Sequence, residues 1–548
     1  MLAVASPAQA GTLSQDAELR ALLSQSPSAA SAGIIPLPLA AGSRRHDGPL
    51  GPRLLVGARS HSAVPGLVAL LRRLGARPRA IRSIAVVAAT VRRPARLAAA
   101  VRRDPRVAYV ERDPRLRLAG DGDTPDPAHG NINFSWAFDA VRAGAALAAA
   151  GNGSGRTVAV LDTGADLDHP DLIGRMGQAF DTASGGSAVS DLVGHGTFVA
   201  GLISAIDGNG LGGKGVAGAT AILPVRASTT GDFTLGDVLR GLDFAIRRGA
   251  DVINLSLAGD TFSASQARAL AATFYNDVLP VAASGNRALD GNPTEFPAAF
   301  LGGLRGAPGI GLSVGATLPD DQPADFSNHN DYVSLAAPGA SPDCTRGVFS
   351  TVPRNPNSIW DEEASECTPP VSFSGAGGRW GYGQGTSFAA PLASGIAALV
   401  WQVEPELQSE QVAHVMIRSA RQTFDSPGWN EYTGSGVVDG GAAVALAEVY
   451  DTDPPTVHAR AGRLGGLVRI RLLRSGDRTD PGHELAAGVT YSAVVSTDRG
   501  RSFRRVKRSS RPFRAQLTLR GQKRHLVVGL TCDANNNCGV KRLGRFKP

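Results

Sequence analysis

The sequence predicts an α/β protein whose central parallel sheet is preceded by a small α+β module and followed by an all-β sandwich. Three observations support this fold class. Apolar strands alternate with helices through the middle of the chain. A compact β-α-β-β-α-β pattern precedes them, and alternating strands divided by turns follow the linker Asp453–Pro455. A chain of 548 residues exceeds what one core normally holds, so several domains are expected.

Composition and charge narrow the class of protein. Hydrophobic residues make up 43% of the chain, which is ample for packed cores. The net charge of +8 comes mainly from basic residues in Arg72–Arg117 and Arg460–Lys547. Such segments suit nucleic acid or a membrane surface, but no nucleic-acid-binding motif accompanies them, so we expect a basic, solvated surface and no nucleic-acid partner. No apolar run reaches the roughly 18 residues that a membrane span needs.

The first 50 residues are interpreted as a residual signal peptide, leader and linker. Met1–Ala10 ends in Ala8-Gln9-Ala10, which matches a signal-cleavage pattern, but it lacks a basic n-region and a full apolar h-region. We interpret it as the tail of a signal peptide whose start is lost. Residues 11–50 are rich in Ala, Ser, Pro and Gly, which is typical of a linker.

The four cysteines form two local pairs, Cys344 with Cys367 and Cys532 with Cys538. Neither pair has CxxC spacing or a nearby histidine, which disfavours a zinc site. Local pairing in loops indicates two disulfides and an oxidising compartment. We therefore expect a secreted, extracellular protein.

Residues 51–118 carry the β-α-β-β-α-β order, which matches the split βαβ unit of ferredoxin-like folds. The stretch that follows, 119–130, is polar and rich in Gly, Asp and Pro, and is interpreted as an exposed linker. The expected elements are Leu54–Ala58, Val64–Leu74, a β-rich run with a hairpin at Ile81–Val91, Pro94–Arg103 and Val107–Glu111.

Residues 131–450 form the largest predicted domain. Apolar strands separated by helices predict a parallel sheet covered on both faces, which places the chemistry at the carboxyl ends of the strands. The expected strands are Thr157–Leu161, Ala221–Arg226, Val252–Leu257, Leu279–Ala283 and Ile310–Val314. The expected helices are His195–Ile206, Leu235–Arg248, Ser263–Asn276, Ser387–Trp401 and Ser409–Arg421.

Residues 451–548 change to period-two alternation with turns between the segments, which predicts a β-sandwich. The expected strands include Leu467–Leu472, Thr490–Val495, Ala515–Leu519 and His525–Leu530.

Three polar residues stand where elements of the central domain begin or end. Asp162 follows an apolar strand, His195 opens a helix of small residues, and Ser387 opens a buried helix after a Gly-Thr turn. Each has a plainer interpretation alone: a turn-forming Asp, a helix-capping or solvent-facing His and a helix-capping Ser. Together they supply the carboxylate, the base and the nucleophile that acyl transfer needs.

Asn286 adds a fourth polar group at the end of the strand segment Ala282–Asn286. The plainer interpretation is a Gly-Asn turn. As a functional group, its side-chain amide would donate a hydrogen bond to a developing oxyanion. The N–H of Ser387, at the positive end of a helix dipole, would be the second donor.

The motifs around these four residues are similar to those of the subtilisin-family (subtilase, S8-type) serine proteases. The motifs are VLDTG, GHGTFVAG, AASGN and GTSFAAP, and they occur in the family's order within Asn131–Leu446. The resemblance implies a three-layer α/β/α catalytic domain. It further implies that Asp162 orients His195, which acts as the base. Ser387 would be the nucleophile, and Asn286 would complete the oxyanion hole.

The resemblance also implies a substrate cleft with two walls of small residues. One wall would pair with the backbone of an extended peptide, and the other would close the S1 pocket. The first wall shows no acidic cluster, which argues against strict cleavage after Lys or Arg. The walls are Ser256, Leu257, Ala258 and Gly259 on one side, and Ala283, Ser284 and Gly285 on the other.

A structural calcium ion is a further implication of the resemblance, with Asp171 and Asn209 as its ligands in and beside the loop 207–213. Side-chain and loop oxygens suit a hard cation. The alternative is a glycine-rich turn without an ion. No cofactor is expected for catalysis.

The module at 51–118 resembles the inhibitory propeptide of subtilases, which implies that the protein's own propeptide blocks the cleft in cis until it is cut between about Arg117 and His129. Two stretches depart from a minimal member of the family. Ser341–Arg379 is longer and contains two of the cysteines, so it either shapes the cleft or stabilises the surface. The C-terminal β-domain is also an addition. It either binds a cell wall, a carbohydrate or a protein substrate, or it stabilises the protein.

We therefore expect a secreted, self-processing serine endopeptidase that hydrolyses polypeptides through an acyl-enzyme on Ser387. One alternative is a catalytically silent scaffold. Another is a cell-surface or carbohydrate-binding protein that acts through the C-terminal domain. Within the enzyme class, a narrow processing protease competes with a broad scavenging one, and the insertion favours the narrow type.

Overall fold

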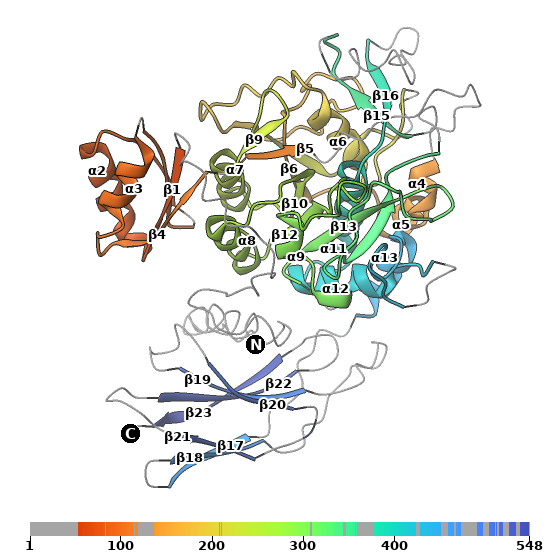
Figure 1. Cartoon of the computed structure of the whole chain (residues 1–548). Coiled ribbons are helices and arrows are strands. Elements are labelled where there is room, and N and C mark those ends of the chain that lie inside the picture. Colours follow the sequence, from red (N-terminus) through yellow and green to blue (C-terminus); the bar gives the residue numbers. More distant parts are fainter. Residues whose placement is uncertain are drawn as a thin grey trace, which may run out of the picture. The chain divides into compact units, whose positions relative to one another are not determined.

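The computed structural model describes most of the chain between residues 53 and 450 and the strands beyond it (Figure 1). The described ranges are 53–118, without 83, 92 and 114; 136–450, without 208, 210, 307–308, 343–346, 357, 359–376 and 424–427; and 459–464, 467–472, 490–496, 504–509, 511, 514–518, 525–532 and 538–546. The predicted signal tail and leader lie outside these ranges.

Contacts divide the chain into two compact units, Ser43–Ala447 and a second unit that contains Glu448–Pro548. Within the first unit, the N-terminal module is a four-stranded antiparallel sheet in the order β2-β3-β1-β4, carrying two helices. This confirms the predicted β-α-β-β-α-β order. The elements are β1 (Arg53–Ala58), α2 (Val64–Arg73), β2 (Arg77–Ile81), β3 (Val86–Thr90), α3 (Pro94–Val101) and β4 (Val107–Arg112).

The centre of the first unit is a seven-stranded sheet in the order β14-β13-β12-β10-β6-β8-β7, and its adjacent strands are parallel. The predicted parallel sheet is therefore confirmed. The strands are buried along most of their length because helices cover both faces. They are β6 (Thr157–Asp162), β7 (Phe180–Asp181), β8 (Ala221–Arg226), β10 (Val252–Leu255), β12 (Leu279–Ala283), β13 (Leu312–Thr317) and β14 (Leu335–Pro338).

Helices α7 (Leu235–Arg247) and α8 (Ala264–Tyr275) cover one face of this sheet, and α6 (His195–Ser204) and α11 (Thr386–Val403) cover the other (Figure 1). Among the described residues, α11 is long and apolar enough to cross a membrane by length and composition, but 89% of it is buried inside the unit. It is therefore the core helix that its small residues predict. The remaining α-helices are α4 (Trp136–Ala140), α5 (Ala143–Ala150), α9 (Ala298–Leu301), α12 (Ser409–Ser419) and α13 (Gly440–Glu448).

Two smaller sheets border the central one. The predicted strand Val252–Leu257 divides into β10 and β11 (Leu257–Ala258), and β11 joins β5 (Arg115–Leu118) and β9 (Asp232–Thr234) in a three-stranded antiparallel sheet. The strands β15 (Val348–Val352) and β16 (Arg379–Gly383) form a hairpin; β15 lies within the predicted insertion Ser341–Arg379, and β16 begins at its last residue.

The second unit contains two antiparallel sheets, in the orders β17-β18-β21 and β20-β19-β22-β23, which confirms the predicted β-sandwich. Alternate residues of the strands meet in one buried apolar cluster. The strands are β17 (Ala459–Leu464), β18 (Leu467–Leu472), β19 (Thr490–Ser496), β20 (Arg504–Ser509), β21 (Arg514–Thr518), β22 (His525–Cys532) and β23 (Cys538–Phe546).

Candidate active site

Asp162 and His195 form a buried pair at the carboxyl end of β6. His195 Nδ1 lies 2.9 Å from Asp162 Oδ1 and 3.0 Å from Oδ2, and both side chains are almost fully buried. The N–H of Thr163 donates to Asp162 Oδ1 at 2.8 Å, which fixes the carboxylate. A carboxylate at Nδ1 holds the proton on that nitrogen, so Nε2 is the nitrogen that can accept one.

Helix α6 approaches β6 closely because of its second residue. A Cβ at Gly196 would lie 2.2 Å from the carbonyl oxygen of Gly164 and 3.2 Å from Asp162 Cβ, so any larger residue would push the helix away. The glycine therefore sets the distance across which His195 reaches Asp162.

Asp191 organises the start of the same helix, and the sequence analysis missed it. Its buried carboxylate accepts hydrogen bonds from the N–H groups of Val193, Gly194 and Thr197. It also accepts the hydroxyl protons of Thr163 at 2.8 Å and Thr197 at 2.7 Å. The usual capping position carried no signal, because the N-cap of α6 is Gly194 and Asp191 stands three residues before it. Only a negative charge shortly before a helix, which complements the dipole, hinted at its role.

Thr163 connects the two catalytic elements. Its hydroxyl donates to Asp191 and accepts the N–H of Gly196 at 3.0 Å, while its own N–H holds Asp162. The end of β6 and the beginning of α6 are therefore tied together by one threonine and one aspartate.

Ser387 is the second residue of α11 and is fully buried. Its Oγ donates to the carbonyl oxygen of Ser256 at 3.2 Å, and Ser256 Oγ donates to the carbonyl oxygen of Ser387 at 2.7 Å. The next residue, Phe388, places its ring centroid 5.3 Å from that of His195. His195 Nε2 is buried and makes no hydrogen bond within the described residues, so it has an unused site for a proton.

Asn286 follows β12 and faces the start of α11. Its Oδ1 accepts the N–H of Thr386 at 2.9 Å and the Thr386 hydroxyl at 2.7 Å. Because the oxygen is held in this way, the Nδ2 donors face the opposite direction. Thr386 is thus a second residue that the sequence analysis missed, although its position directly before Ser387 offered a signal.

The first predicted substrate wall is paired in the structure with a segment of the same chain. Strand β5 runs antiparallel to β11, with Leu118 opposite Leu257 and Arg117 opposite Ala258. On its other edge β5 pairs with β9. An extended peptide can therefore add to this wall as the middle strand of a sheet.

The second predicted wall carries an acidic neighbour. A Cβ at Gly285 would lie 2.1 Å from Glu295 Oε2, and Glu295 is buried. Gly259 exchanges backbone hydrogen bonds with Phe296, which brings this segment to the end of the first wall. Arg287 Nη1 lies 3.5 Å from Glu295 and 3.1 Å from Asp260. Carboxylates do therefore stand beside the walls, although not on the first wall itself.

The two residues expected to bind calcium lie together but do not fit an ion. Asn209 Nδ2 donates to Asp171 Oδ1 at 2.8 Å, while Asn209 Oδ1 accepts the N–H of Leu211 at 2.9 Å. Trp380 Nε1 donates to Asp171 Oδ2 at 2.9 Å. Both carboxylate oxygens thus receive N–H groups, and burial raises the pKa of Asp171. The described residues contain no group of three or more His, Cys, Asp or Glu that could hold a metal.

Cys532 and Cys538 lie directly opposite each other in the backbone register of β22 and β23. Cys344 and Cys367 lie outside the described residues. The register is compatible with the predicted disulfide between Cys532 and Cys538.

A parallel sheet that presents a buried Asp-His pair, a serine at a helix N-terminus and an oriented amide defines a serine hydrolase. A sequence model described as the subtilase family matches residues 153–436. The chain therefore belongs to the subtilase family of serine proteases. Its positions 162, 195 and 387 lie within that match.

Individual relatives agree with this assignment. The chain is 33% identical over 274 residues to a thermophilic serine proteinase of Bacillus sp. (strain AK1), covering 50% of this chain and 57% of the relative. It is 31% identical over 341 residues to alkaline elastase YaB of Bacillus sp. (strain YaB), covering 62% of this chain and 75% of that relative. The crystal structure of fervidolysin from Fervidobacterium pennivorans matches with a TM-score of 0.58 at 20% identity over 91% of this chain and 92% of that one, which shows a shared fold.

Proposed function

We propose that this protein is a secreted serine endopeptidase that is made as a zymogen and processes itself. The observation that carries the proposal is strand β5, a segment of the chain's own N-terminal part, which pairs with β11 beside the buried Asp162–His195 pair and Ser387. A peptide backbone in that position presents a carbonyl to the nucleophile.

The proposed reaction follows from the positions of the polar groups. Ser387 Oγ attacks the substrate carbonyl carbon while His195 Nε2 takes the hydroxyl proton, and Asp162 stabilises the resulting imidazolium. The Ser387 hydroxyl, which donates to the Ser256 carbonyl, must first turn toward His195. The oxyanion then accepts hydrogen bonds from the Ser387 N–H and Asn286 Nδ2, each worth about 3 kcal/mol in the transition state.

The tetrahedral intermediate collapses when His195 returns the proton to the leaving amine, which frees the C-terminal peptide and leaves an acyl-enzyme on Ser387. Water then repeats the sequence in place of the serine hydroxyl and releases the N-terminal peptide. All the groups used are amino-acid side chains and backbone N–H groups, so the proposed reaction uses no cofactor.

Two carboxylates of the N-terminal module support its role as an inhibitory propeptide. Glu111 accepts the N–H groups of Ala264 and Ser265, the first residues of α8, and the hydroxyl of Ser263. Asp113 accepts the N–H of Gly236 at the start of α7. The module thus caps two helices of the catalytic domain while β5 fills its cleft.

The maturation bond lies just beyond β5 in this proposal. The described pairing reaches Leu118 opposite Leu257, and the next residue of the first wall is Ser256, whose carbonyl accepts the Ser387 hydroxyl. We expect the cut within a few residues after Leu118. Secretion is supported by the facing cysteines of β22 and β23, which would form a disulfide outside the cell.

Intact mass spectrometry of the wild type and of Ser387→Ala tests this function. We expect only the wild type to lose its first 118 or so residues and to bind a serine-directed fluorophosphonate at Ser387. A wild type that stays unlabelled after another protease removes the N-terminal module would favour the silent scaffold. In that case the C-terminal unit, with a cell-wall or carbohydrate target, would carry the function.

A further inference from the structure

The C-terminal unit concentrates the positive charge of the protein. Residues 451–548 contain 21 Lys and Arg against 7 Asp and Glu, whereas the whole chain has a net charge of only +8. The described strands of this unit, β17 to β23, contain no acidic residue. Their positive charge is therefore not balanced within the sheets themselves.

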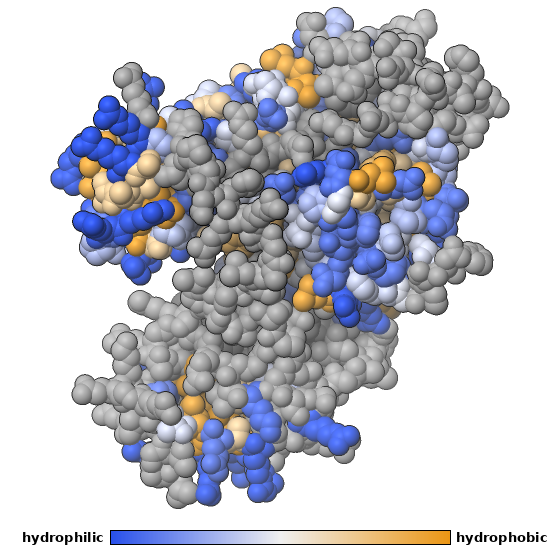
Figure 2. All heavy atoms as spheres, in the orientation of Figure 1, coloured by the Kyte–Doolittle hydropathy of each residue, from blue (hydrophilic) through white to orange (hydrophobic). Residues whose placement is uncertain are grey.

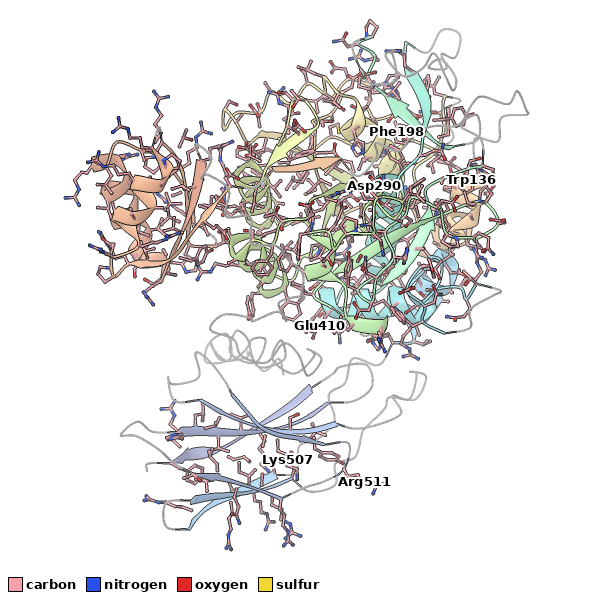
Figure 3. The ribbon with its side chains drawn as sticks, in the orientation of Figure 1. Trp136, Phe198, Asp290, Glu410, Lys507 and Arg511 are labelled. Carbon is pink, nitrogen blue, oxygen red and sulfur yellow. The ribbon has the colours of Figure 1, made fainter. Side chains whose placement is uncertain are left out.

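Four arginines gather on the outer surface of the sheet β17-β18-β21, which we call the arginine face: Arg460, Arg469, Arg471 and Arg514. All four side chains are exposed. Arg460 lies opposite Arg471 in the register, and Arg471 lies opposite Arg514, so three arginines form a row across three strands. Figures 2 and 3 show hydrophilic, nitrogen-tipped side chains projecting from this sheet.

The opposite surface of the same sheet explains why these arginines point outward. The residues between them, Val468, Ile470, Leu472 and Leu517, are buried in the core of the sandwich. The period-two pattern therefore fixes which surface is charged.

The row does not stabilise the fold. Like charges directly opposite each other in a sheet are unfavourable by a few tenths of a kcal/mol per pair. None of the four arginines forms an ion pair with another described residue of the unit. A bound polyanion would remove the repulsion, because each guanidinium would gain a counter-charge.

The chemistry of the face selects the kind of anion. Arginine guanidinium groups match phosphate oxygens with paired hydrogen bonds. Neighbouring strands are about 4.8 Å apart and alternate residues along a strand about 6.8 Å, so the charges suit a chain with one anion every few ångströms. The strands that carry the arginine face, β17, β18 and β21, include no aromatic residue on which a nucleobase would stack. Charge alone is left as the means of recognition.

We propose that the arginine face binds a linear phosphate polymer of the cell surface, of the polyol-phosphate type. This selects the cell-wall target among those that the sequence left open for the C-terminal unit, and it does not depend on proteolysis. Binding would hold the protease at the cell envelope, where its polypeptide substrates would be met.

Binding of full-length Ser387→Ala to immobilised poly(glycerol phosphate) tests the proposal, since this background prevents self-cleavage. The test variant adds Arg460→Gln, Arg471→Gln and Arg514→Gln. The matched control adds Lys507→Gln, Lys541→Gln and Arg545→Gln, which removes the same charge from exposed positions of the other sheet. We expect the test variant to bind at least tenfold more weakly, with a salt dependence shallower by about 2 in log–log slope. The control should lose less than threefold.

Thermal melts of the three proteins show whether each is folded, so that a loss of binding is read only from folded variants. Equal losses in both variants would overturn the arginine face, because net charge alone would then explain binding. Tighter binding to single-stranded DNA or to polygalacturonate than to poly(glycerol phosphate) would overturn the choice of polymer. If the parent protein binds isolated cell envelopes but not the polymer, the C-terminal unit can still bind the wall, but the proposed binding of the polymer by the arginine face is wrong.

Discussion

Two buried aspartates of the catalytic domain, Asp191 and Asp171, differ in where their hydrogen-bond donors come from. Asp191 receives its donors from residues 163 to 197, on the segments that carry Asp162 and His195. Asp171 receives donors from Asn209 and from Trp380, which lies 209 residues away. The first carboxylate is built into the catalytic elements, and the second joins distant parts of the chain.

The second aspartate depends on the hairpin β15–β16, since Trp380 lies on β16 directly after the predicted insertion. Trp380 is fully buried, and it packs with Phe349 and Tyr382 of the hairpin β15–β16. A Cβ at Gly212 would lie 1.7 Å from Trp380 Nε1, so the glycine-rich loop is shaped to receive the indole. Gly212, one of the glycines that suggested an ion-binding loop, thus makes room for an aromatic side chain. An indole and an amide N–H thus occupy the carboxylate oxygens that a cation would need.

The largest effect is expected from Asp191→Ala. The change leaves five donors without their acceptor and frees the start of α6, so His195 should shift relative to Ser387. A displacement of about 1 Å costs on the order of 100-fold in activity. We expect kcat/KM on a peptide substrate to fall by at least that factor while α11 and the sheet stay folded by circular dichroism. Asp191→Asn, which keeps one acceptor oxygen, should lose less; unchanged kcat/KM in Asp191→Ala would show that other contacts position the helix.

A smaller effect, on stability alone, is expected from Trp380→Phe. Removing the indole N–H leaves Asp171 Oδ2 buried without that donor, which costs about 1–3 kcal/mol. The midpoint of urea unfolding should fall, and kcat should stay near its original value. Phe349→Leu serves as the control, because it changes the same apolar cluster without touching the aspartate. Equal destabilisation in both variants would mean that packing, and not the hydrogen bond, holds the loop.

A third buried carboxylate, Asp113, extends the comparison to pH. Burial raises its pKa from 3.8 to about 6 in the full-length chain. Between those values the assembled protein holds a proton that the unfolded chain has released, so the stability from this group is present below about pH 4 and lost as pH rises through about 6. Asp113→Asn, made on Ser387→Ala, should therefore stabilise the zymogen by about 1 kcal/mol at pH 7.5 and by nothing at pH 4. If Asp113→Asn raises the free energy of unfolding equally at both pH values, Asp113 does not hold a proton in the folded protein.

The smallest expected effect comes from metal removal. Because N–H groups donate to both oxygens of Asp171, EDTA should not lower the melting temperature by destabilising the loop around Trp380. Terbium, a calcium substitute, is excited by a nearby tryptophan and would report an ion there. We expect the terbium luminescence of the wild type to be the same as that of Asp171→Asn. Luminescence that is present in the wild type and lost in Asp171→Asn, together with a lower melting temperature in EDTA, would restore the calcium interpretation.

The active site was predictable to the extent that its signals are local. Asp162, His195, Ser387 and Asn286 each stand at the end of an element, in motifs that the family keeps in a fixed order. Asp191 and Thr386 were equally local and were missed because they hold other residues in place and need not touch the reacting atoms. Glu295 and Trp380 could not have been found by spacing, since their partners are brought near by β11, β12 and the insertion.

The sequence by itself determined the β-α-β-β-α-β module, the parallel sheet and the sandwich, and it supplied the proposed nucleophile, base and carboxylate, because hydrophobic periodicity and helix-terminal chemistry are properties of neighbouring residues. Only the tertiary structure decided that β5 joins β11, that Trp380 donates a hydrogen bond to Asp171, and that three arginines share one row. Those outcomes depend on strand register and on the packing of residues distant in the chain, which no local pattern encodes.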